Sequence, residues 1–404
     1  MKNIAIVGGG LAGLTCAHAL QQRGIPSIVF EAESGAGGRC DAAAYLLGPD
    51  VYTDTFRLAA SLGLEHDLLE IQPIAGQFYK GRIYHHRVSS VTGLLGFKGL
   101  NIADKTLLSR MAYFLARYSA KLDLHHPERG VSLDDETTAG FVKRELSQNI
   151  LNYVAGPLIS TLFYYSSEET SRLLYLNIAK YMYNIRMFTI RGGIGRIADR
   201  LAQGVTIEQG RRVESIVGDG AGYLVNGRAF SDVVLAVPGT AVLGIGGVDD
   251  LLDAQDREFF ANCKYGRAVA VTVEATRPLD RCYALSIPRV ERRHAAAIVH
   301  HDFIDPSTTA TGHHVTIIGG GDSVTAEQLL HDFAHIYRVT PHEFTWREWT
   351  SAMPKFPPGR FREVASFVSR HRRPGLSFCG DYLLGPFIEA AVTTGLTAAK
   401  HCKN

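Results

Sequence analysis

Short apolar runs alternate with amphipathic segments along this chain, and that alternation predicts an α/β protein. Residues 3–7 (NIAIV) are almost uniformly apolar and rich in β-branched side chains, which is typical of a buried strand. Residues 11–23 then carry apolar side chains at helical spacing, and residues 27–31 (SIVFE) predict a second strand. Further strands are predicted within residues 231–242 and, from alternating apolar and polar positions, within residues 265–279.

Two other segments predict helices. Residues 134–173 have a helical pattern that we expect to break at Gly156-Pro157, because proline removes a backbone donor and crowds the preceding turn. Residues 107–122 are amphipathic, with Arg110 and Arg117 among apolar and aromatic side chains. Such a helix either packs its apolar side into the protein or lies on a membrane surface. Packing is the more common outcome, and we expect it here.

Composition narrows the class of protein. The 404 residues suit about two domains, and 46% hydrophobic with 20% charged residues is ordinary for a globular protein. The net charge of +2 favours no nucleic-acid partner. The six cysteines form no C-x-x-C pair, so we expect reduced thiols in a cytoplasmic protein, with peripheral membrane contact as an alternative. We expect neither a signal peptide nor a membrane span, which needs ~18 continuous apolar residues.

Three glycines between the first strand and the first helix form the pattern G-x-G-x-x-G. Gly8 permits a tight turn, Gly10 lets a pyrophosphate approach the backbone, and Gly13 lets helix and strand pack closely. The phosphates would then face the N–H groups at the helix N-terminus. Glu31 ends the second strand, where a carboxylate accepts hydrogen bonds from ribose hydroxyls. The pattern therefore predicts a bound dinucleotide, with a βαβ unit that binds nothing as the alternative.

The stretch FEAESGAGGRC at residues 30–40 resembles the flavin-dependent amine oxidase, protoporphyrinogen oxidase and phytoene desaturase superfamily. In that superfamily E-A-x-x-x-x-G-G-R follows the second strand and precedes a Gly-Pro pair, which is Gly48-Pro49 here, although the intervening segment is shorter. Residues 187–225 resemble the return of the chain into the cofactor domain, and residues 375–399 resemble the closing motif. The likeness is greatest to the protoporphyrinogen-oxidase-like branch.

This resemblance implies FAD as the cofactor. The backbone at Gly37-Gly38 would pass near the diphosphate and flavin, and Arg39 would help to hold them. The backbone at Val213 would meet the adenine, and Asp381 would bind the ribityl or diphosphate end. A helix that starts near Pro386 would direct its N-terminal dipole at the flavin. The implied cofactor residues are Gly8, Gly10, Leu11, Ala12, Gly13, Glu31, Ala32, Gly37, Gly38, Arg39, Gly48, Pro49, Val213, Gly380, Asp381, Ile388 and Glu389.

The resemblance also implies a discontinuous architecture. A Rossmann-like FAD-binding domain of the GR2-type flavoproteins would contain residues 1–74, 187–260 and 356–404. An inserted α+β substrate-binding domain would contain residues 75–186 and 261–355.

A second glycine-rich stretch, VTIIGGGDSVTAEQLL at residues 315–330, is similar to a nucleotide loop and would suggest NADPH. We expect instead a strand, a turn and a helix of the substrate domain. Val324 occupies the third glycine position, where it would crowd helix against strand. No apolar strand with an acidic end follows the helix.

One position separates branches of the superfamily. Many amine oxidases carry a lysine near flavin N5, and this chain has Ala270 at that place, with Lys264 too early along the strand to replace it. The resemblance therefore implies an FAD-dependent oxidase or dehydrogenase that removes a hydride from a C–H bond of a small organic substrate and passes electrons to oxygen or another acceptor. We nominate no catalytic acid or base, because the flavin performs the chemistry. Arg186 and Arg191 are candidates for binding a carboxylate, although surface charge explains them more simply.

Three alternatives remain: an amine oxidase, an isoprenoid desaturase or dehydroxylase, and a redox-neutral flavoprotein. Binding motifs alone do not separate them. His-His pairs stand at 85–86, 125–126, 300–301 and 313–314, but none has metal-ligand spacing, so we expect no metal.

Overall fold

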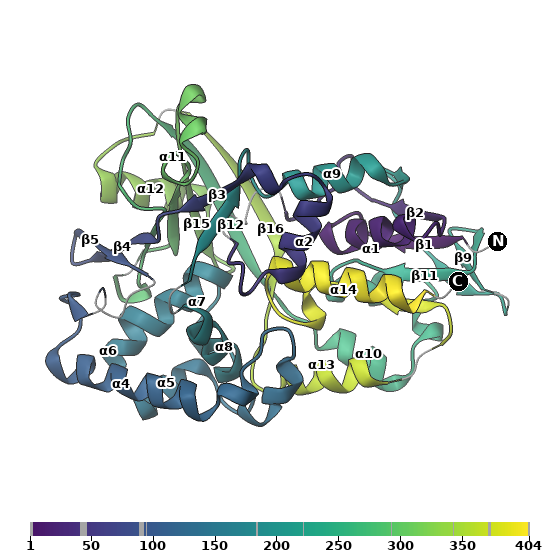
Figure 1. The fold of residues 1–404 in the computed structure, drawn as a ribbon, viewed down its shortest axis with the longest axis horizontal. Coiled ribbons are helices and arrows are strands. Elements are labelled where there is room, and N and C mark those ends of the chain that lie inside the picture. The colour runs from purple at the N-terminus through teal and green to yellow at the C-terminus, as the bar shows by residue number, and fades with distance from the viewer. Residues whose placement is uncertain are drawn as a thin grey trace.

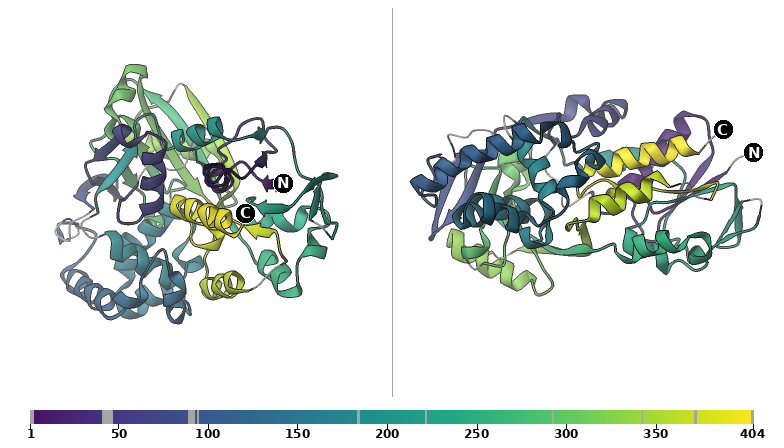
Figure 2. Two further views of the ribbon diagram at one scale, coloured as in Figure 1. Left: turned by 45° about the vertical axis from the view of Figure 1, so that its right-hand side comes forward. Right: turned by 90° about the horizontal axis from the view of Figure 1, so that it is seen from below.

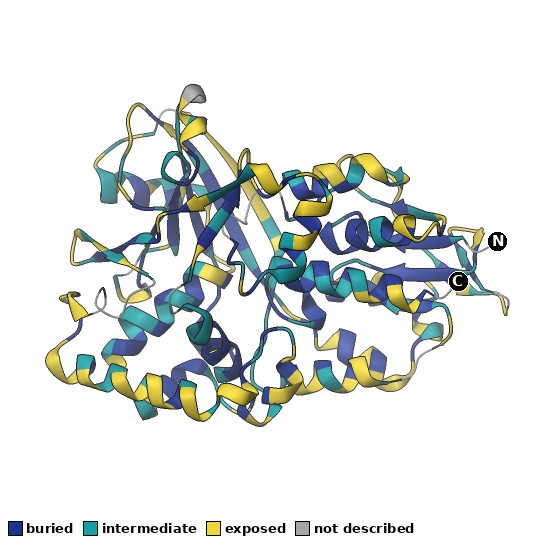
Figure 3. Ribbon diagram, viewed as in Figure 1, coloured by how far each residue is buried: buried dark blue, intermediate teal, exposed yellow. Residues whose placement is uncertain are grey.

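The structure is a computed structural model, and it describes residues 3–40, 47–88, 93, 95–182, 185–220, 222–291, 293–341, 343–370 and 373–402. Two sheets lie along the long axis of the molecule (Figure 1). The sheet that contains β1 occupies the end where both termini lie, and a larger sheet occupies the other end. The inner strands of both sheets are largely buried, whereas the two edge strands of the larger sheet and the outer faces of the surrounding helices are largely exposed (Figure 3).

The first sheet is parallel and has the most buried strand near its centre. Its order is β17 (Leu376–Phe378), β11 (Asp232–Leu235), β1 (Ile4–Val7), β2 (Ser27–Phe30) and β7 (Ile207–Glu208). β1 pairs with β2 on one side and with β11 on the other. The predictions of strands within residues 3–7, 27–31 and 231–242 are therefore confirmed, because parallel strands buried on both faces are short and uniformly apolar.

The second sheet has seven strands and is mostly antiparallel. Its order is β16 (Phe344–Pro354), β12 (Tyr265–Ala275), β15 (His313–Gly320), β14 (Ala297–His300), β13 (Ala284–Ser286), β4 (Ile74–Tyr79) and β5 (Arg82–Arg87). Smaller sheets pair β3 (Leu68–Ile71) with β6 (Met187–Ile190) and join β8 (Ile216–Gly218), β9 (Tyr223–Val225) and β10 (Arg228–Phe230).

Helices cover both sheets, and several come from distant parts of the chain. They are α1 (Leu11–Gln22), α2 (Thr53–Ser61), α4 (Ile102–Arg117), α5 (Thr138–Glu145), α6 (Gln148–Ile150), α7 (Gly156–Phe163), α8 (Arg172–Met182), α9 (Arg196–Gly204), α10 (Ala254–Ala261), α11 (His301–Ile304), α12 (Ala326–Tyr337), α13 (Arg360–Ser369) and α14 (Ile388–His401). The C-terminal α14 lies beside α1, as two further views show (Figure 2). The contact is close because a side chain at Gly395 would lie 2.4 Å from the Ala12 carbonyl oxygen.

The predicted helix break at Gly156-Pro157 is wrong. A π-helical segment, Leu151–Ala155, runs directly into α7, and Pro157 lies in the first turn of that helix. In a regular α-helix an interior proline clashes with the carbonyl four residues earlier. The wider π turn changes which carbonyls face Pro157, so the helix continues through this residue. Gly156 is also required, because a Cβ there would lie 2.7 Å from the Leu151 carbonyl oxygen.

The amphipathic segment predicted at residues 107–122 forms most of α4. Phe114 is buried and packs edge-on against Phe141 of α5, with ring centroids 5.1 Å apart. Ile102 and Tyr113 of the same helix are exposed. None of the helices in the described part of the chain is long and apolar enough to cross a membrane.

The glycines of residues 319–321 belong to β15 and the turn that follows, and α12 comes next. A Cβ at Gly320 would lie 1.7 Å from the Tyr164 carbonyl oxygen, and one at Gly319 would lie 2.6 Å from the His294 carbonyl oxygen. These glycines therefore allow close packing of β15 against neighbouring backbone. This is the strand, turn and helix that we expected at this place.

Candidate functional site

The first glycine loop has the geometry of an anion-binding turn. Gly8 adopts a φ of 111°, and its N–H donates to the Phe30 carbonyl at 2.9 Å. A Cβ at Gly13 would lie 2.1 Å from the Gly8 carbonyl oxygen, so only glycine permits α1 to begin this close to β1. A Cβ at Gly10 would meet no described atom within 4 Å. Gly10 is the N-cap of α1 and has no side chain to cap it, which leaves the helix N-terminus open to an anion.

Glu31 organises the loop beside this helix. Its Oε2 accepts a hydrogen bond from the Gly9 N–H at 2.7 Å, and its Oε1 accepts one from the Glu33 N–H at 2.8 Å. The Glu31 backbone carbonyl accepts from the Arg211 N–H at 2.7 Å, which brings the segment that contains Val213 next to β2. Within the described residues, no backbone hydrogen bond is formed by the Val213 N–H. Ala32, which follows Glu31, is half-buried.

The second glycine pair folds back on the first loop. The Gly37 N–H donates to the Gly9 carbonyl at 2.8 Å, and a Cβ at Gly38 would lie 3.4 Å from the Gly10 Cα. Gly37 and Gly38 have φ values of 113° and 61°, in the left-handed region that favours glycine. The two glycine-rich stretches therefore form one surface, from which Arg39 extends.

Arg39 connects this surface to the last motif of the chain. Its Nη1 lies 2.9 Å from Asp381 Oδ2 and donates to the Ala352 carbonyl of β16 at 2.7 Å. The guanidinium lies over the Tyr265 ring, 5.6 Å from its centroid. Burial disfavours the charged form of Arg39, but Asp381 and Tyr265 outweigh it and raise the pKa of Arg39. Arg39 is therefore held as a cation where the two sheets approach one another.

Asp381 keeps one acceptor that the protein does not use. Its Oδ1 is buried and, among the described residues, has no hydrogen-bond partner. A buried carboxylate oxygen without a donor is costly, so a ligand hydroxyl would relieve it. Gly380, which precedes it, has a φ of 150°, and its N–H donates to Thr394 Oγ1 at 2.9 Å. Sequence reasoning missed Thr394, Tyr265 and Ala352 as supports, because nothing local marks these contacts.

Glu389 lies where we expected it, but its carboxylate has a structural role. The residue is 1% exposed, and its oxygens accept from Asp54 N at 2.7 Å, Thr55 N at 2.9 Å and Thr55 Oγ1 at 2.7 Å. These donors begin α2, so Glu389 caps that helix from α14. α14 itself begins at Ile388, two residues after Pro386 and as expected, with Phe387 as its N-cap. The helix N-terminus, rather than the Glu389 side chain, is the part that remains for a ligand.

The Gly48-Pro49 pair leads into α2. The Gly48 carbonyl accepts from the Tyr52 N–H at 2.8 Å, and a Cβ at Gly48 would lie 3.1 Å from Ile185 Cδ1. Leu47 pairs with Phe188 and attaches this turn to β6. Most of the shortened segment between Arg39 and Gly48, residues 41–46, lies outside the described residues.

A cavity begins at Arg39 and lies against the second sheet. It is lined by Arg39, Tyr164, Ala268, Ala270, Ile318, Trp349, Ala352 and Met353. Ala270, which the resemblance placed at the position of the amine-oxidase lysine, is on the cavity wall. Lys264 is exposed, one residue before β12, and is not part of the lining. In the described structure the Trp349 Nε1–H is buried and donates to no acceptor.

The two arginines considered for a substrate carboxylate lie elsewhere. Arg186 forms a two-point ion pair with Glu70 at 3.0 and 2.8 Å, and both side chains are more than half exposed. Arg191 is exposed as well. Neither lines the cavity, so Arg39 is the cation that faces it.

Comparison with known proteins identifies the family. The sequence matches the flavin-containing amine oxidoreductases over residues 11–403. This chain belongs to that family. Its members are FAD-dependent oxidoreductases, so the expected superfamily, cofactor and enzyme class are confirmed.

The relatives are distant. A flavin-containing amine oxidase A of Sus scrofa is 31% identical over 98 residues, which cover 22% of this chain and only 18% of that relative. Among solved structures, cyclohexylamine oxidase from Brevibacterium oxydans IH-35A has a TM-score of 0.76 at 18% identity, covering 99% of this chain and 98% of that one. A candidate protoporphyrinogen oxidase from Exiguobacterium sp. 255-15 has a TM-score of 0.76 at 16% identity, with 99% and 98% covered. At this identity the likeness shows the fold, and the expected fold class is confirmed.

The arrangement fits the cofactor of the family. A glycine loop with open space at Gly10, an uncapped helix N-terminus and a carboxylate with an unused acceptor lie on connected elements. These features suit a diphosphate, for which helix N-termini are favourable, and a polyol, which would donate to Asp381 Oδ1.

Proposed function

We propose that this flavoenzyme removes a hydride from a C–H bond of a small, largely apolar substrate held in the cavity, in the manner of the protoporphyrinogen-oxidase-like branch. The observation that carries the proposal is the lining of the cavity. It combines apolar walls with Ala270, at the position that we aligned with the amine-oxidase lysine, and begins at Arg39, which pairs with Asp381. When bound, FAD supplies the hydride acceptor, and electrons then pass to oxygen or another carrier.

The chain's own residues bind, orient and exclude water. Glu31 would hold the adenosine ribose, the α1 N-terminus the diphosphate, and Asp381 the polyol through its unpaired oxygen. Arg39 would add a fixed positive charge near the diphosphate. The N-terminus of α14 would favour negative charge that develops on the ring. The division into cofactor-binding and substrate-binding domains is part of this proposal, and the two large sheets support it.

The cavity also suggests the substrate class. The walls are alanine, isoleucine and methionine with aromatic rings, and the Trp349 Nε1–H is the unpaired donor among them. A substrate with one hydrogen-bond acceptor on an apolar body would satisfy that donor.

An anaerobic reduction experiment tests the proposal. The FAD-loaded protein is mixed with porphyrinogens, small cyclic amines, other small oxidisable metabolites and isoprenoids, and loss of the oxidised flavin absorbance is followed. We expect bleaching by a small metabolite and reoxidation by oxygen or a quinone. Bleaching by amines alone, with peroxide formed in air, would make the protein an amine oxidase. Bleaching by isoprenoids alone would make it a desaturase, and no bleaching with any candidate would favour a redox-neutral flavoprotein.

A pair of tryptophan variants then tests the cavity. Trp349→Phe removes the indole donor but keeps an aromatic ring, so we expect KM for the identified substrate to rise about tenfold, the loss of one hydrogen bond. Trp346→Phe is the matched control, because Trp346 lies on the same strand and is 58% exposed. Equal KM values for both variants would contradict the assignment of the cavity as the substrate site.

A further inference from the structure

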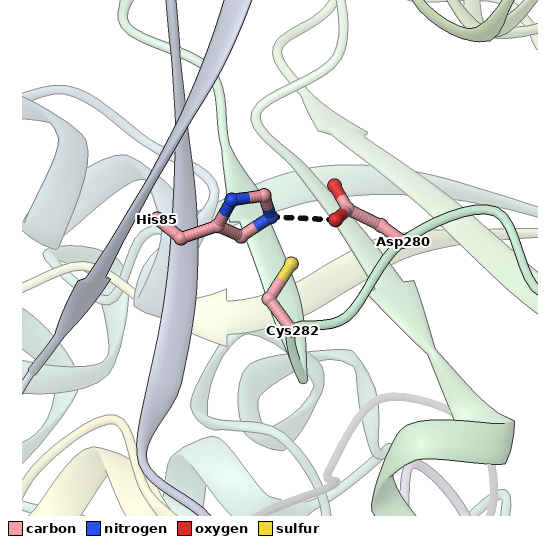
Figure 4. A group of neighbouring side chains, drawn as sticks. All are labelled: His85, Asp280 and Cys282. Carbon is pink, nitrogen blue, oxygen red and sulfur yellow. Dashed lines mark hydrogen bonds and ion pairs between the residues drawn. The ribbon is translucent and has the colours of Figure 1, made fainter.

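A group of ligand-type side chains lies in the second sheet, away from the cavity. His85 comes from β5, whereas Asp280 and Cys282 come from the connection between β12 and β13, and their side chains point toward one another (Figure 4). One ligand atom from each residue lies within 4.8 Å of the other two. The His85 Nε2 and Asp280 Oδ1 are 2.5 Å apart.

The backbone brings these residues together at a glycine. His85 is paired with Gly76 of the neighbouring strand β4, and Gly76 is in turn paired with Leu285 of β13. A Cβ at Gly76 would lie 3.2 Å from Cys282 Sγ, so any larger residue would crowd the thiol. The glycine therefore leaves room for Cys282 beneath the imidazole of His85.

An unused acceptor points to a missing partner. The Asp280 side chain is 8% exposed, and its Oδ2 is buried without a hydrogen-bond partner among the described residues. His85 Nε2 and the Arg281 N–H both contact Oδ1, so their partner is the other oxygen of the carboxylate. Because buried carboxylate oxygens are costly when unpaired, a positive group or a donor at Oδ2 would stabilise the cluster.

We propose that His85, Asp280 and Cys282 bind a divalent transition-metal ion of the zinc type. Imidazole, thiolate and carboxylate are the ligands that zinc takes in proteins. Ligand atoms around a tetrahedral zinc ion are separated by roughly 3.3–3.7 Å, from bond lengths of about 2.0–2.3 Å. A zinc ion bound between His85 and Asp280 would replace their direct contact, and the two side chains would have to separate only slightly to admit it. His85 is 43% exposed, so the ion would enter from solvent, and water would complete its coordination.

A second layer would support the thiolate. His300 is completely buried, and its Nδ1 lies 3.8 Å from Cys282 Sγ. Its Nε2 lies 2.8 Å from the Tyr337 hydroxyl. If the hydroxyl donates to Nε2, a neutral imidazole carries its proton on Nδ1 and directs it at the sulfur. A metal-bound thiolate would accept that hydrogen bond, the kind of outer contact that orients metal ligands.

We expected no metal from the sequence, because none of the His-His pairs has metal-ligand spacing. The proposed site departs from that expectation. His85 belongs to one of those pairs, but the other ligands lie about two hundred positions later in the chain. Local spacing therefore carried no signal for it.

Metal titration of the full-length, FAD-loaded and chelator-treated protein tests the proposal. Co²⁺ is the spectroscopic probe, because tetrahedral Co²⁺ absorbs in the red, beyond the flavin bands, and Zn²⁺ is then added as a competitor. We expect one Co²⁺ per chain, displaced by Zn²⁺, and a higher melting temperature in Zn²⁺. His85→Gln should weaken binding at least about tenfold. His86→Gln, the neighbouring position on the same strand, should not change the affinity.

A cysteine variant gives a second readout. In Cys282→Ser the sulfur-to-cobalt charge-transfer band should disappear from the difference spectrum, even if some affinity remains. If Cys282→Ser does not fold, the exposed His85→Gln variant decides the question, with flavin content as the check on folding. Wild-type binding no tighter than that of His85→Gln, or an equal loss in His86→Gln, would overturn the proposal.

Discussion

Replacement of Glu31 by alanine should weaken FAD binding by a calculable amount. A carboxylate offers about four acceptor positions. Two are used here, by the Gly9 N–H at 2.7 Å and the Glu33 N–H at 2.8 Å. About two remain for ribose hydroxyls. Hydrogen bonds to a charged acceptor contribute about 1.5–3 kcal/mol each when buried. Two such bonds at the lower end of this range give about 3 kcal/mol, and because Glu31 is only half-buried we expect a loss of about 2–3 kcal/mol.

This loss corresponds to a rise in Kd of roughly 30- to 150-fold, at about 1.4 kcal/mol per factor of ten. The measurement is titration of apoprotein with FAD by calorimetry or by quenching of flavin fluorescence. Glu31→Gln keeps one acceptor oxygen but no charge, so its Kd should lie between wild type and Glu31→Ala. Glu33→Ala is the matched control, because Glu33 is exposed and its contacts with Glu31 Oε1 and the Gly210 N–H use backbone atoms that alanine keeps.

Binding of FAD by Glu31→Ala within about threefold of wild type, a change of less than about 0.7 kcal/mol, would refute this role of Glu31. An equal loss of affinity in Glu33→Ala would refute it as well, since the effect would then come from general disturbance of the loop.

Three further predictions concern glycine, capping and pH. Gly10→Ala should leave the melting temperature of the apoprotein unchanged but reduce its flavin content. Gly13→Ala should destabilise the apoprotein by about 2 kcal/mol or more, since its Cβ would lie 2.1 Å from a carbonyl oxygen. Equal melting temperatures of the two variants would contradict this prediction. Glu389→Gln should lower the free energy of unfolding by about 1–2 kcal/mol through the weakened α2 cap, and an unchanged denaturation midpoint would argue against it. Burial and neighbouring histidines lower the pKa of His301 from 6.5 to about 4. As the pH falls, this histidine takes up a proton near pH 6.5 in the unfolded chain but only near pH 4 in the folded protein. The free energy of unfolding should therefore fall by up to about 3 kcal/mol between pH 6.5 and pH 4, and by less in His301→Gln. Identical pH profiles in urea denaturation would refute the last point.

Local sequence signals predicted the nucleotide half of the fold well. The first helix begins at Leu11 as expected and ends at Gln22, one residue early, because strand, glycine turn and helix are all set by neighbours in the chain. Pro157 shows the limit of such reasoning. The effect of a proline on a helix depends on the hydrogen-bond register of that helix. A π segment changes this register, and no residue type in the sequence marks where such a segment occurs.

Contacts between distant positions were out of reach. Glu389 could be placed near the flavin helix by resemblance, but its carboxylate caps α2, more than three hundred positions earlier in the chain. The support of Arg39 by Tyr265 and the Ala352 carbonyl likewise depends on how the two sheets approach one another. The physical reason is that the residues next to each of these partners in the sequence carry no pattern that indicates the contact.

The close crossing of α14 on α1 has a consequence for biosynthesis. β1 and α1 are synthesised long before β17 and α14, which complete their sheet and cover their helix. A nascent chain therefore carries only half of the nucleotide cradle until β17 and α14 have emerged. Capture of the coenzyme must follow synthesis of these two elements, which makes their docking a late step in maturation of this flavoprotein.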